Sequence, residues 1–140
     1  MIILDTNVLS ELMRAKQAHA SVFAWVAGHP QAMLCTTSIN KAEILYGIAV
    51  LPEGGRRAAL AMAAERMFDN VFEGRVLPFD YAAAGHYARI VAVRRNKGRP
   101  IANFDAQIAA IAHTAGAQLA TRDVSGFADC GLTLINPWNA

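Results

Sequence analysis

The chain carries little charge and few cysteines, and both shortages limit what it can be. Only 17% of its 140 residues are charged and 54% are hydrophobic, so it is too apolar for an intrinsically disordered chain. Its two cysteines, Cys35 and Cys130, form no C-x-x-C pair and do not resemble zinc ligands. We expect both thiols to lie in or near the core, because free cysteine behaves as a small hydrophobic residue.

Long apolar runs, internal repeats and low-complexity segments are also absent. No uninterrupted apolar stretch is long enough to span a bilayer. The first residues, Met-Ile-Ile-Leu-Asp, lack the basic region and the cleavage site of a signal peptide. We therefore expect a cytoplasmic protein without membrane contact, folded as one domain over residues 1–140.

What the sequence does contain is an alternation of short apolar segments and helical patterns. Strands are predicted at Ile2–Leu4, Ala32–Cys35, Arg75–Leu77, Gln118–Thr121 and Leu132–Ile135. Helices are predicted at Val8–Arg14, His19–Gly28, Ile39–Val50, Arg56–Phe72, Tyr81–Asn96 and from Asn103 or Phe104 to Ala115. The expected helix caps are Thr6 or Asn7, Thr37 or Ser38, and Asp80. The alternation favours an α/β fold, a parallel sheet with helices on both faces.

The first predicted strand ends in an acid, Asp5, directly before a helix. Open parallel sheets bind their ligands at the C-terminal ends of the strands, and a buried carboxylate is costly without a partner. Asp123 follows the strand Gln118–Thr121, which we expect beside the first strand, so both acids emerge at one edge. Taken alone, Asp123 is also compatible with an ordinary turn.

Two further acids can reach this edge from helices. Glu43 lies among apolar residues after the second strand, and Asp105 opens the helix that leads into the fourth strand. Each has a simpler interpretation, Glu43 as a surface residue and Asp105 as a partner of the helix dipole.

Four carboxylates at one edge would repel one another. Carboxylates about 5 Å apart repel by about 3 kcal/mol per pair at an effective dielectric constant of roughly 20, and a divalent cation relieves this repulsion. Oxygen ligands suit Mg²⁺ or Mn²⁺, and such an ion activates water and stabilises an anionic phosphoryl transition state.

Positive charge is concentrated in one short segment. The formal net charge is only +2, but Arg94, Arg95, Lys97 and Arg99 are near neighbours in the sequence. Such a patch is compatible with contacts to phosphate groups. It is equally typical of a solvated helix end, where cations are favoured.

An ordered series of motifs gives the chain a family resemblance. The motifs are Ile3-Leu4-Asp5-Thr6-Asn7-Val8, Ala42-Glu43-Ile44-Leu45-Tyr46-Gly47, Arg75-Val76-Leu77-Pro78-Phe79-Asp80, Gly98-Arg99-Pro100-Ile101, Asp105-Ala106-Gln107-Ile108-Ala109-Ala110, Leu119-Ala120-Thr121-Arg122-Asp123 and Asn136-Pro137-Trp138. With this series the chain resembles the PIN-domain ribonucleases, and among them the VapC/FitB-type toxins of bacterial toxin–antitoxin modules.

The resemblance implies a single PIN-like domain with a five-stranded parallel sheet of order 3-2-1-4-5. It also implies cleavage of single-stranded RNA and a homodimer. Inhibition is expected from a small antitoxin that has a DNA-binding domain and lays a helix or extended tail in an apolar groove.

The resemblance also implies an acidic Mg²⁺ pocket. The positions that match this pocket are Asp5, Glu43, Asp105 and Asp123. We expect Asp5 and Asp105 to be the direct ligands, with Mn²⁺ able to substitute. Hydrogen bonds around the acids are expected from Thr6, Asn7 and Thr121. The candidates for contacts with the RNA backbone are Arg94, Arg95 and Arg99.

The sequence is also compatible with other functions. In one, the acidic pocket is inactive and the protein is a binding module that joins a DNA-binding antitoxin on an operator, although all four acids are intact. In another, Asp5 accepts a phosphoryl group, but Asn7 stands where such phosphatases need a second Asp, and the acids and Lys of a receiver domain are missing. A metal-independent ribonuclease with two catalytic histidines is disfavoured, because the four histidines form no H-x-x-x-H or H-E-x-x-H pair.

Overall fold

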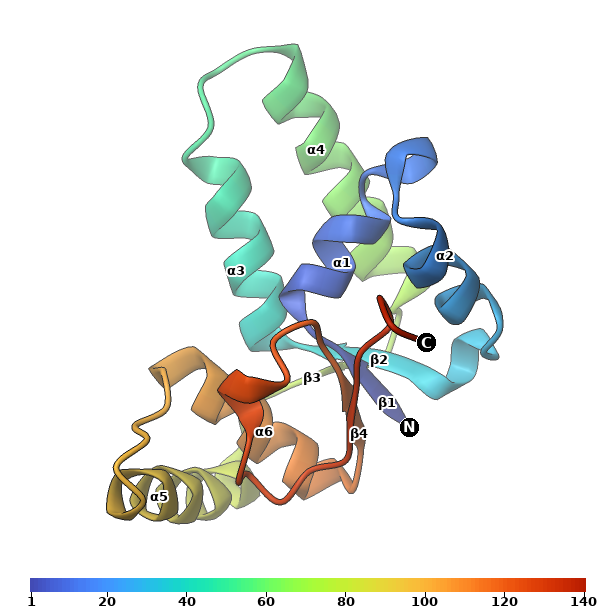
Figure 1. The fold of residues 1–140 in the computed structure, drawn as a ribbon. Coiled ribbons are helices and arrows are strands. Elements are labelled where there is room, and N and C mark those ends of the chain that lie inside the picture. The colour runs from blue at the N-terminus through green and yellow to red at the C-terminus, as the bar shows by residue number, and fades with distance from the viewer.

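A parallel sheet of order β3-β2-β1-β4-β5 forms the centre of the computed structural model, which describes all residues from Met1 to Ala140 (Figure 1). The strands are Ile2–Leu4 (β1), Leu34–Thr37 (β2), Val76–Leu77 (β3), Gln118–Ala120 (β4) and Leu134–Ile135 (β5). In the central strand, Ile3 is aligned with Cys35 of β2 and with Leu119 of β4. The predicted α/β fold and strand order are confirmed.

Six α-helices cover the two faces of the sheet. They are Thr6–Leu12 (α1), Ala20–Ala27 (α2), Ser38–Ala49 (α3), Gly55–Arg66 (α4), Tyr81–Asn96 (α5) and Asn103–Ala115 (α6). Short helical turns lie at Ala15–Gln17 (η1), Gln31–Met33 (η2), Met67–Val71 (η3) and Ser125–Phe127 (η4). In Figure 1, α5 and α6 lie below the sheet and α1 to α4 lie above it. No helix combines the length and the apolar character that crossing a membrane would require.

The alternation of side chains along β1 divides the core into two clusters. Ile2 and Leu4 pack with α1 to α4 on one face, and Ile3 packs with α5 and α6 on the other. Every residue of β1 is buried, which explains why this strand is a continuous apolar run rather than an alternating one. Cys35 and Cys130 are both buried and free, as predicted.

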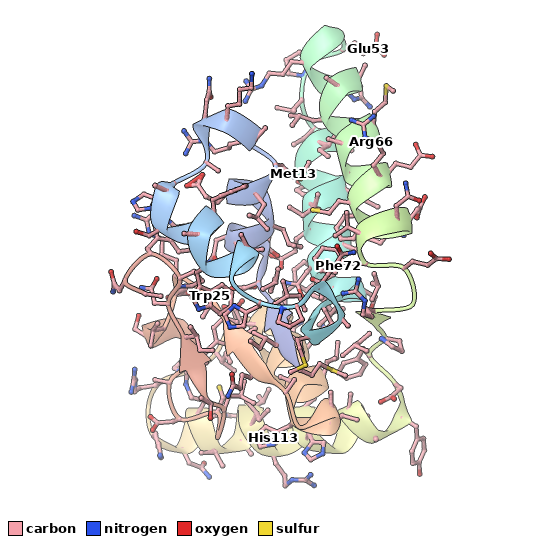
Figure 2. All side chains as sticks on the ribbon, turned by 90° about the vertical axis from the view of Figure 1, so that its right-hand side faces the viewer. Met13, Trp25, Glu53, Arg66, Phe72 and His113 are labelled. Carbon is pink, nitrogen blue, oxygen red and sulfur yellow. The ribbon has the colours of Figure 1, made fainter.

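The α3–α4 hairpin extends away from the rest of the molecule. Figure 2 shows Glu53 at its tip and His113 on the opposite side of the fold. The hairpin is held at its base, where Ile44 and Ile48 of α3 and Ala64 of α4 join the cluster that contains Leu4. The start of α3, directly after β2, therefore lies at the C-terminal edge of the sheet, whereas the end of α4 leads through η3 to the start of β3.

Three predicted boundaries are wrong, and the first two change the edge of the sheet. The first helix begins at Thr6 because Asp5 itself is the cap, and its Oδ1 accepts the Thr6 N–H at 2.8 Å. The second strand is Leu34–Thr37 rather than Ala32–Cys35, so two threonines enter the sheet. The predicted helix Arg56–Phe72 is interrupted, since α4 ends at Arg66 and a π-helical turn follows. The predicted caps Thr37 and Asp80 are confirmed by their bonds to the N–H groups of Asn40 and Ala83.

Candidate active site

Asp5 lies at the C-terminal end of β1 in a cradle of hydrogen-bond donors. The residue is only 5% exposed. Its Oδ1 accepts from the Thr6 N–H at 2.8 Å and from Nδ2 of Asn40 at 3.1 Å. Its Oδ2 accepts from Oγ1 of Thr121 at 2.7 Å and, at 3.5 Å, from Nδ2 of Asn7. The donors come from α1, from α3 and from the end of β4, so the fold fixes the orientation of this carboxylate.

Glu43 points toward the same edge rather than into solvent. It is half-buried on α3, and its Oε1 accepts from Oγ1 of Thr6 at 2.8 Å. The Thr6 hydroxyl in turn accepts from Nδ2 of Asn40 at 3.0 Å. Thr6 therefore links two acids, because its N–H bonds to Asp5 and its hydroxyl bonds to Glu43.

Asp123 follows β4 in an exposed turn that is closed by its own side chain. Its N–H donates to Oγ1 of Thr121 at 3.0 Å, and its Oδ1 accepts from the Gly126 N–H at 3.1 Å. A Cβ atom on Gly126 would lie 2.2 Å from Oδ2 of Asp123, so any larger residue there requires this carboxylate to move. Thr121 joins Asp123 to Asp5, since its hydroxyl also donates to Asp5.

Asp105 lies in the first turn of α6 and is half-buried. Its pKa is raised to about 6, first by burial and then by the negative charges of the other three acids, while Arg94 opposes the rise. Burial also raises the pKa of Asp5, with a further rise from Asp123, and the pKa of Glu43, with a further rise from Asp5. The four carboxylates therefore act on one another electrostatically at one edge of the sheet.

None of these four carboxylates is neutralised by a basic side chain. The three salt bridges of the chain join Arg14 to Glu11, and Lys97 and Arg99 to Asp129. The charge concentrated here is relieved either by protonation, which the raised pKa of Asp105 favours, or by a bound cation.

The donor set suits a hard cation. All four acids offer oxygen, whereas both cysteines are buried in the core cluster. No three His, Cys, Asp or Glu side chains lie close enough together to enclose an ion on their own. This arrangement fits Mg²⁺, which is bound through one or two carboxylates and keeps several waters, better than a zinc site that gathers four protein ligands.

Asn40 is the site residue that the sequence analysis missed. It is completely buried, and its side chain donates to Asp5 and Thr6 and accepts from the Thr37 hydroxyl. The available signal was its place on α3, one turn before Glu43 and one turn before the buried Ile44. An amide on the buried side of a helix must find partners inside the protein.

The structure contradicts the prediction that Arg94 contacts the RNA backbone. Arg94 is only 5% exposed, and its guanidinium donates to the carbonyl oxygens of Arg99, Gly126 and Ala128. Arg99 is exposed and pairs with Asp129 at 3.1 Å. Arg95 is exposed on α5, and the RNA contacts of Arg95 and Arg99 stay predictions.

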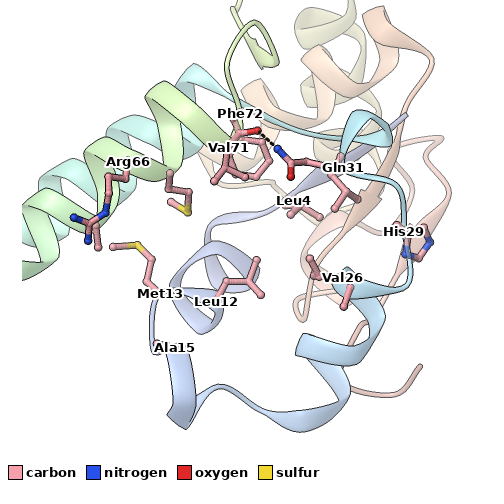
Figure 3. Close-up of a pocket in the computed structure, with 14 residues that line it drawn as sticks. Leu4, Leu12, Met13, Ala15, Val26, His29, Gln31, Arg66, Val71 and Phe72 are labelled. Atoms are coloured by element: carbon pink, nitrogen blue, oxygen red, sulfur yellow. Dashed lines mark hydrogen bonds between the residues drawn. The ribbon is translucent and has the colours of Figure 1, made fainter.

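Two cavities lie among the helices above the sheet. One, of about 530 Å³, lies between α1, α3 and α4. Its lining includes Thr6 and Glu43 and the two arginines Arg14 and Arg56. The other, of about 570 Å³, lies between α1, α2 and η3 and is mainly apolar. Figure 3 shows this second lining, with the hydrogen bond from Gln31 to the Val71 carbonyl (3.1 Å) at one side.

Known proteins share both the sequence pattern and the fold. The profile described as the PIN domain matches residues 2–130. The VapC ribonuclease Y4jK of Sinorhizobium fredii is 41% identical over 138 residues, covering 99% of this chain and 98% of that protein. The toxin FitB of Neisseria gonorrhoeae is 36% identical over 139 residues, covering 99% of each. The structure of FitAB bound to an IR36 DNA fragment is similar with a TM-score of 0.88 at 37% identity, covering 99% of this chain and 96% of that chain. The protein therefore belongs to the PIN-domain family, in the group that includes the VapC and FitB toxins.

Proposed function

We propose that the protein is a Mg²⁺-dependent endoribonuclease toxin of a toxin–antitoxin module. It hydrolyses RNA phosphodiesters at the site formed by Asp5, Glu43, Asp105 and Asp123. The observation that carries the proposal is the hydrogen-bond network in which Thr6 joins Asp5 to Glu43 and Thr121 joins Asp5 to Asp123. Asp105 lies close enough to this network that the charges of the three other acids add to burial in raising its pKa. The name of the Sinorhizobium relative, a VapC ribonuclease, supports the same activity.

The residues of this chain hold and orient the groups that the reaction needs. Asp5 and Asp105 would be the direct ligands of the cation, and Glu43 and Asp123 would complete its surroundings, directly or through water. When bound, the cation activates water and stabilises the negative charge of the phosphoryl transition state. The Thr6 hydroxyl fixes Glu43, and the Thr121 hydroxyl fixes Asp5. Either Glu43 or Asp123 would orient the attacking water.

A small DNA-binding antitoxin is the proposed regulatory partner. The relative FitB is named a toxin, and the similar structure contains FitAB on DNA. The cavity lined by Thr6 and Glu43 offers an antitoxin segment a place beside the acids, and the arginines Arg14 and Arg56 in that lining favour an acidic segment. A homodimer is part of the same proposal.

RNA cleavage tests the activity directly. We expect cleavage of single-stranded RNA in Mg²⁺, none in EDTA, and none with Asp5→Asn, which keeps the size of the side chain and removes its charge. Asp69→Asn is the matched control, because Asp69 is exposed on η3. Cleavage by wild type that continues in EDTA, or at full rate in Asp5→Asn, would refute the mechanism.

The second candidate function is a binding module without catalysis, and the DNA-bound FitAB structure is the observation that favours it. The same experiment separates the two. Absence of cleavage in every condition, together with intact antitoxin binding and operator binding by the complex, would establish the binding module instead.

A further inference from the structure

Arg94 is the one arginine of this chain that is buried, and all of its contacts are to main-chain carbonyls and one sulfur atom. Its Nε donates to the Arg99 carbonyl at 2.7 Å. Its Nη1 donates to the carbonyls of Gly126 and Ala128 at 2.8 and 2.9 Å, with Sγ of Cys130 at 3.8 Å. It forms no salt bridge, so it is not placed as the counter-ion of any single acid.

The carbonyls that Arg94 holds belong to two segments that are far apart in sequence. Arg99 lies in the connection from α5 to α6, and Asp105 follows it in the first turn of α6. Gly126 and Ala128 lie in the turn after β4, which also contains Asp123. A single buried guanidinium therefore fixes the distance between the segments that carry two of the four acids.

The link to Asp123 passes through one residue. The Gly126 carbonyl accepts from Arg94, and the Gly126 N–H donates to Oδ1 of Asp123 at 3.1 Å. The contact is tight, because a Cβ on Gly126 would meet Oδ2 of Asp123 at 2.2 Å. A displacement of this turn would therefore move the carboxylate.

We infer that Arg94 is a positioning residue for the cation site, holding the α5–α6 connection and the turn after β4 so that Asp105 and Asp123 face one ion. The inference depends on the proposed function, since it assumes that the four acids bind a divalent cation. Replacing groups that orient metal ligands typically weakens metal affinity roughly 10- to 100-fold.

The test is Mn²⁺ binding to the full chain, measured by electron paramagnetic resonance for wild type, Arg94→Met, Arg94→Lys and the control Arg89→Met. Arg89 is exposed on the same helix and its one side-chain hydrogen bond is to His86, so its replacement removes the same charge without removing a bond to either segment. We expect Arg94→Met to weaken Mn²⁺ binding by about tenfold. Arg94→Lys should weaken it less, because an ammonium still donates to some of these carbonyls, whereas Met donates to none. The Arg89→Met value should stay within about twofold of wild type.

A role in stability alone gives a different result. It lowers the melting temperature of Arg94→Met but leaves the Mn²⁺ affinity of the folded protein unchanged, and that outcome overturns the inference. If Arg94→Met does not fold, Arg94→Lys is the deciding variant, and wild-type Mn²⁺ affinity in folded Arg94→Lys overturns the inference equally.

A second readout is non-additivity. Arg94→Met should cost less Mn²⁺ affinity in an Asp123→Asn background than in wild type, because part of its effect passes through Asp123. Equal losses in both backgrounds contradict that path.

The outcomes also separate this inference from the proposed function. If wild type itself does not bind Mn²⁺, the metal site and the inference both fail. If wild type binds and Asp5→Ala abolishes binding, but the Arg94 variants bind normally, only the inference fails.

Discussion

Asp105→Asn should stabilise the protein when no divalent ion is present and should lose that advantage when Mn²⁺ is added. The reason is that the negative charge of Asp105 is held in a half-buried position beside three other acids. The amide keeps the size of the side chain and removes the charge. Replacing this acid by a neutral isostere should therefore relieve repulsion in the fold while removing a proposed ligand.

The magnitude follows from the pKa of Asp105, which rises from 3.8 to about 6 on folding. A difference of this size corresponds to about 3 kcal/mol at neutral pH, and solvent screening at a half-exposed site reduces this to about 1–2 kcal/mol. The sign is fixed by linkage: a carboxyl group whose folded pKa is raised favours the fold below pH 3.8, and this contribution is lost as the pH rises through about 6. The advantage of Asp105→Asn should therefore be complete at pH 7.5 and shrink steadily toward pH 4.

Urea unfolding in EDTA at several pH values is the assay, with Asp69→Asn as the control. In saturating Mn²⁺ the order should reverse, because an ion present at 100 times its dissociation constant stabilises wild type by about 2.7 kcal/mol. A wild type more stable than Asp105→Asn in EDTA at pH 7.5 would refute the electrostatic argument. So would an advantage of the same size at every pH, which would indicate packing rather than charge.

Three further changes test other parts of the site and the fold. Asn40→Ala removes a buried donor from Asp5 and from Thr6 and should cost about 2–4 kcal/mol in urea unfolding; a loss under about 1 kcal/mol would contradict its buried role. Gly126→Ala should reduce RNA cleavage strongly, because its Cβ displaces the Asp123 carboxylate, and undiminished cleavage would show that Asp123 is dispensable. Gly116→Ala should cost about 1 kcal/mol of stability and leave cleavage unchanged, since the only obstacle there is the left-handed φ of +61°.

The sequence predicts the parts of this protein that depend on local pattern. β1 is recognisable because each of its residues is buried, and α6 ends at Gly116 because glycine adopts the left-handed conformation that stops a helix. The convergence of Asp5 and Asp123 was accessible because parallel strands share one C-terminal edge. The strand order came from the family resemblance, since nothing in the local pattern determines which strands are neighbours.

What the sequence could not predict depends on partners that are distant and lack a recognisable side chain. Arg94 lies in a basic cluster and looks like a surface residue, but its partners are carbonyls 32 and 34 residues later. Every residue has a carbonyl, so no pattern marks those two. Asn40 was missed for a related reason: its partners, Asp5 and Thr6, lie in another element.

The distribution of hydrogen bonds within the site explains why charge persists at this edge. Asp5, Glu43 and Asp123 each accept hydrogen bonds from the protein, which fix their positions but leave their negative charges in place. Burial, and then the charges of the other three acids, raise the pKa of Asp105, and no lysine or arginine forms a salt bridge with any of the four. A fold selected only for stability would gain from neutral residues here, as Asp105→Asn should demonstrate. The fold instead maintains carboxylates in fixed orientations against their mutual repulsion, and the proposed cation would turn this cost in stability into affinity for the ion.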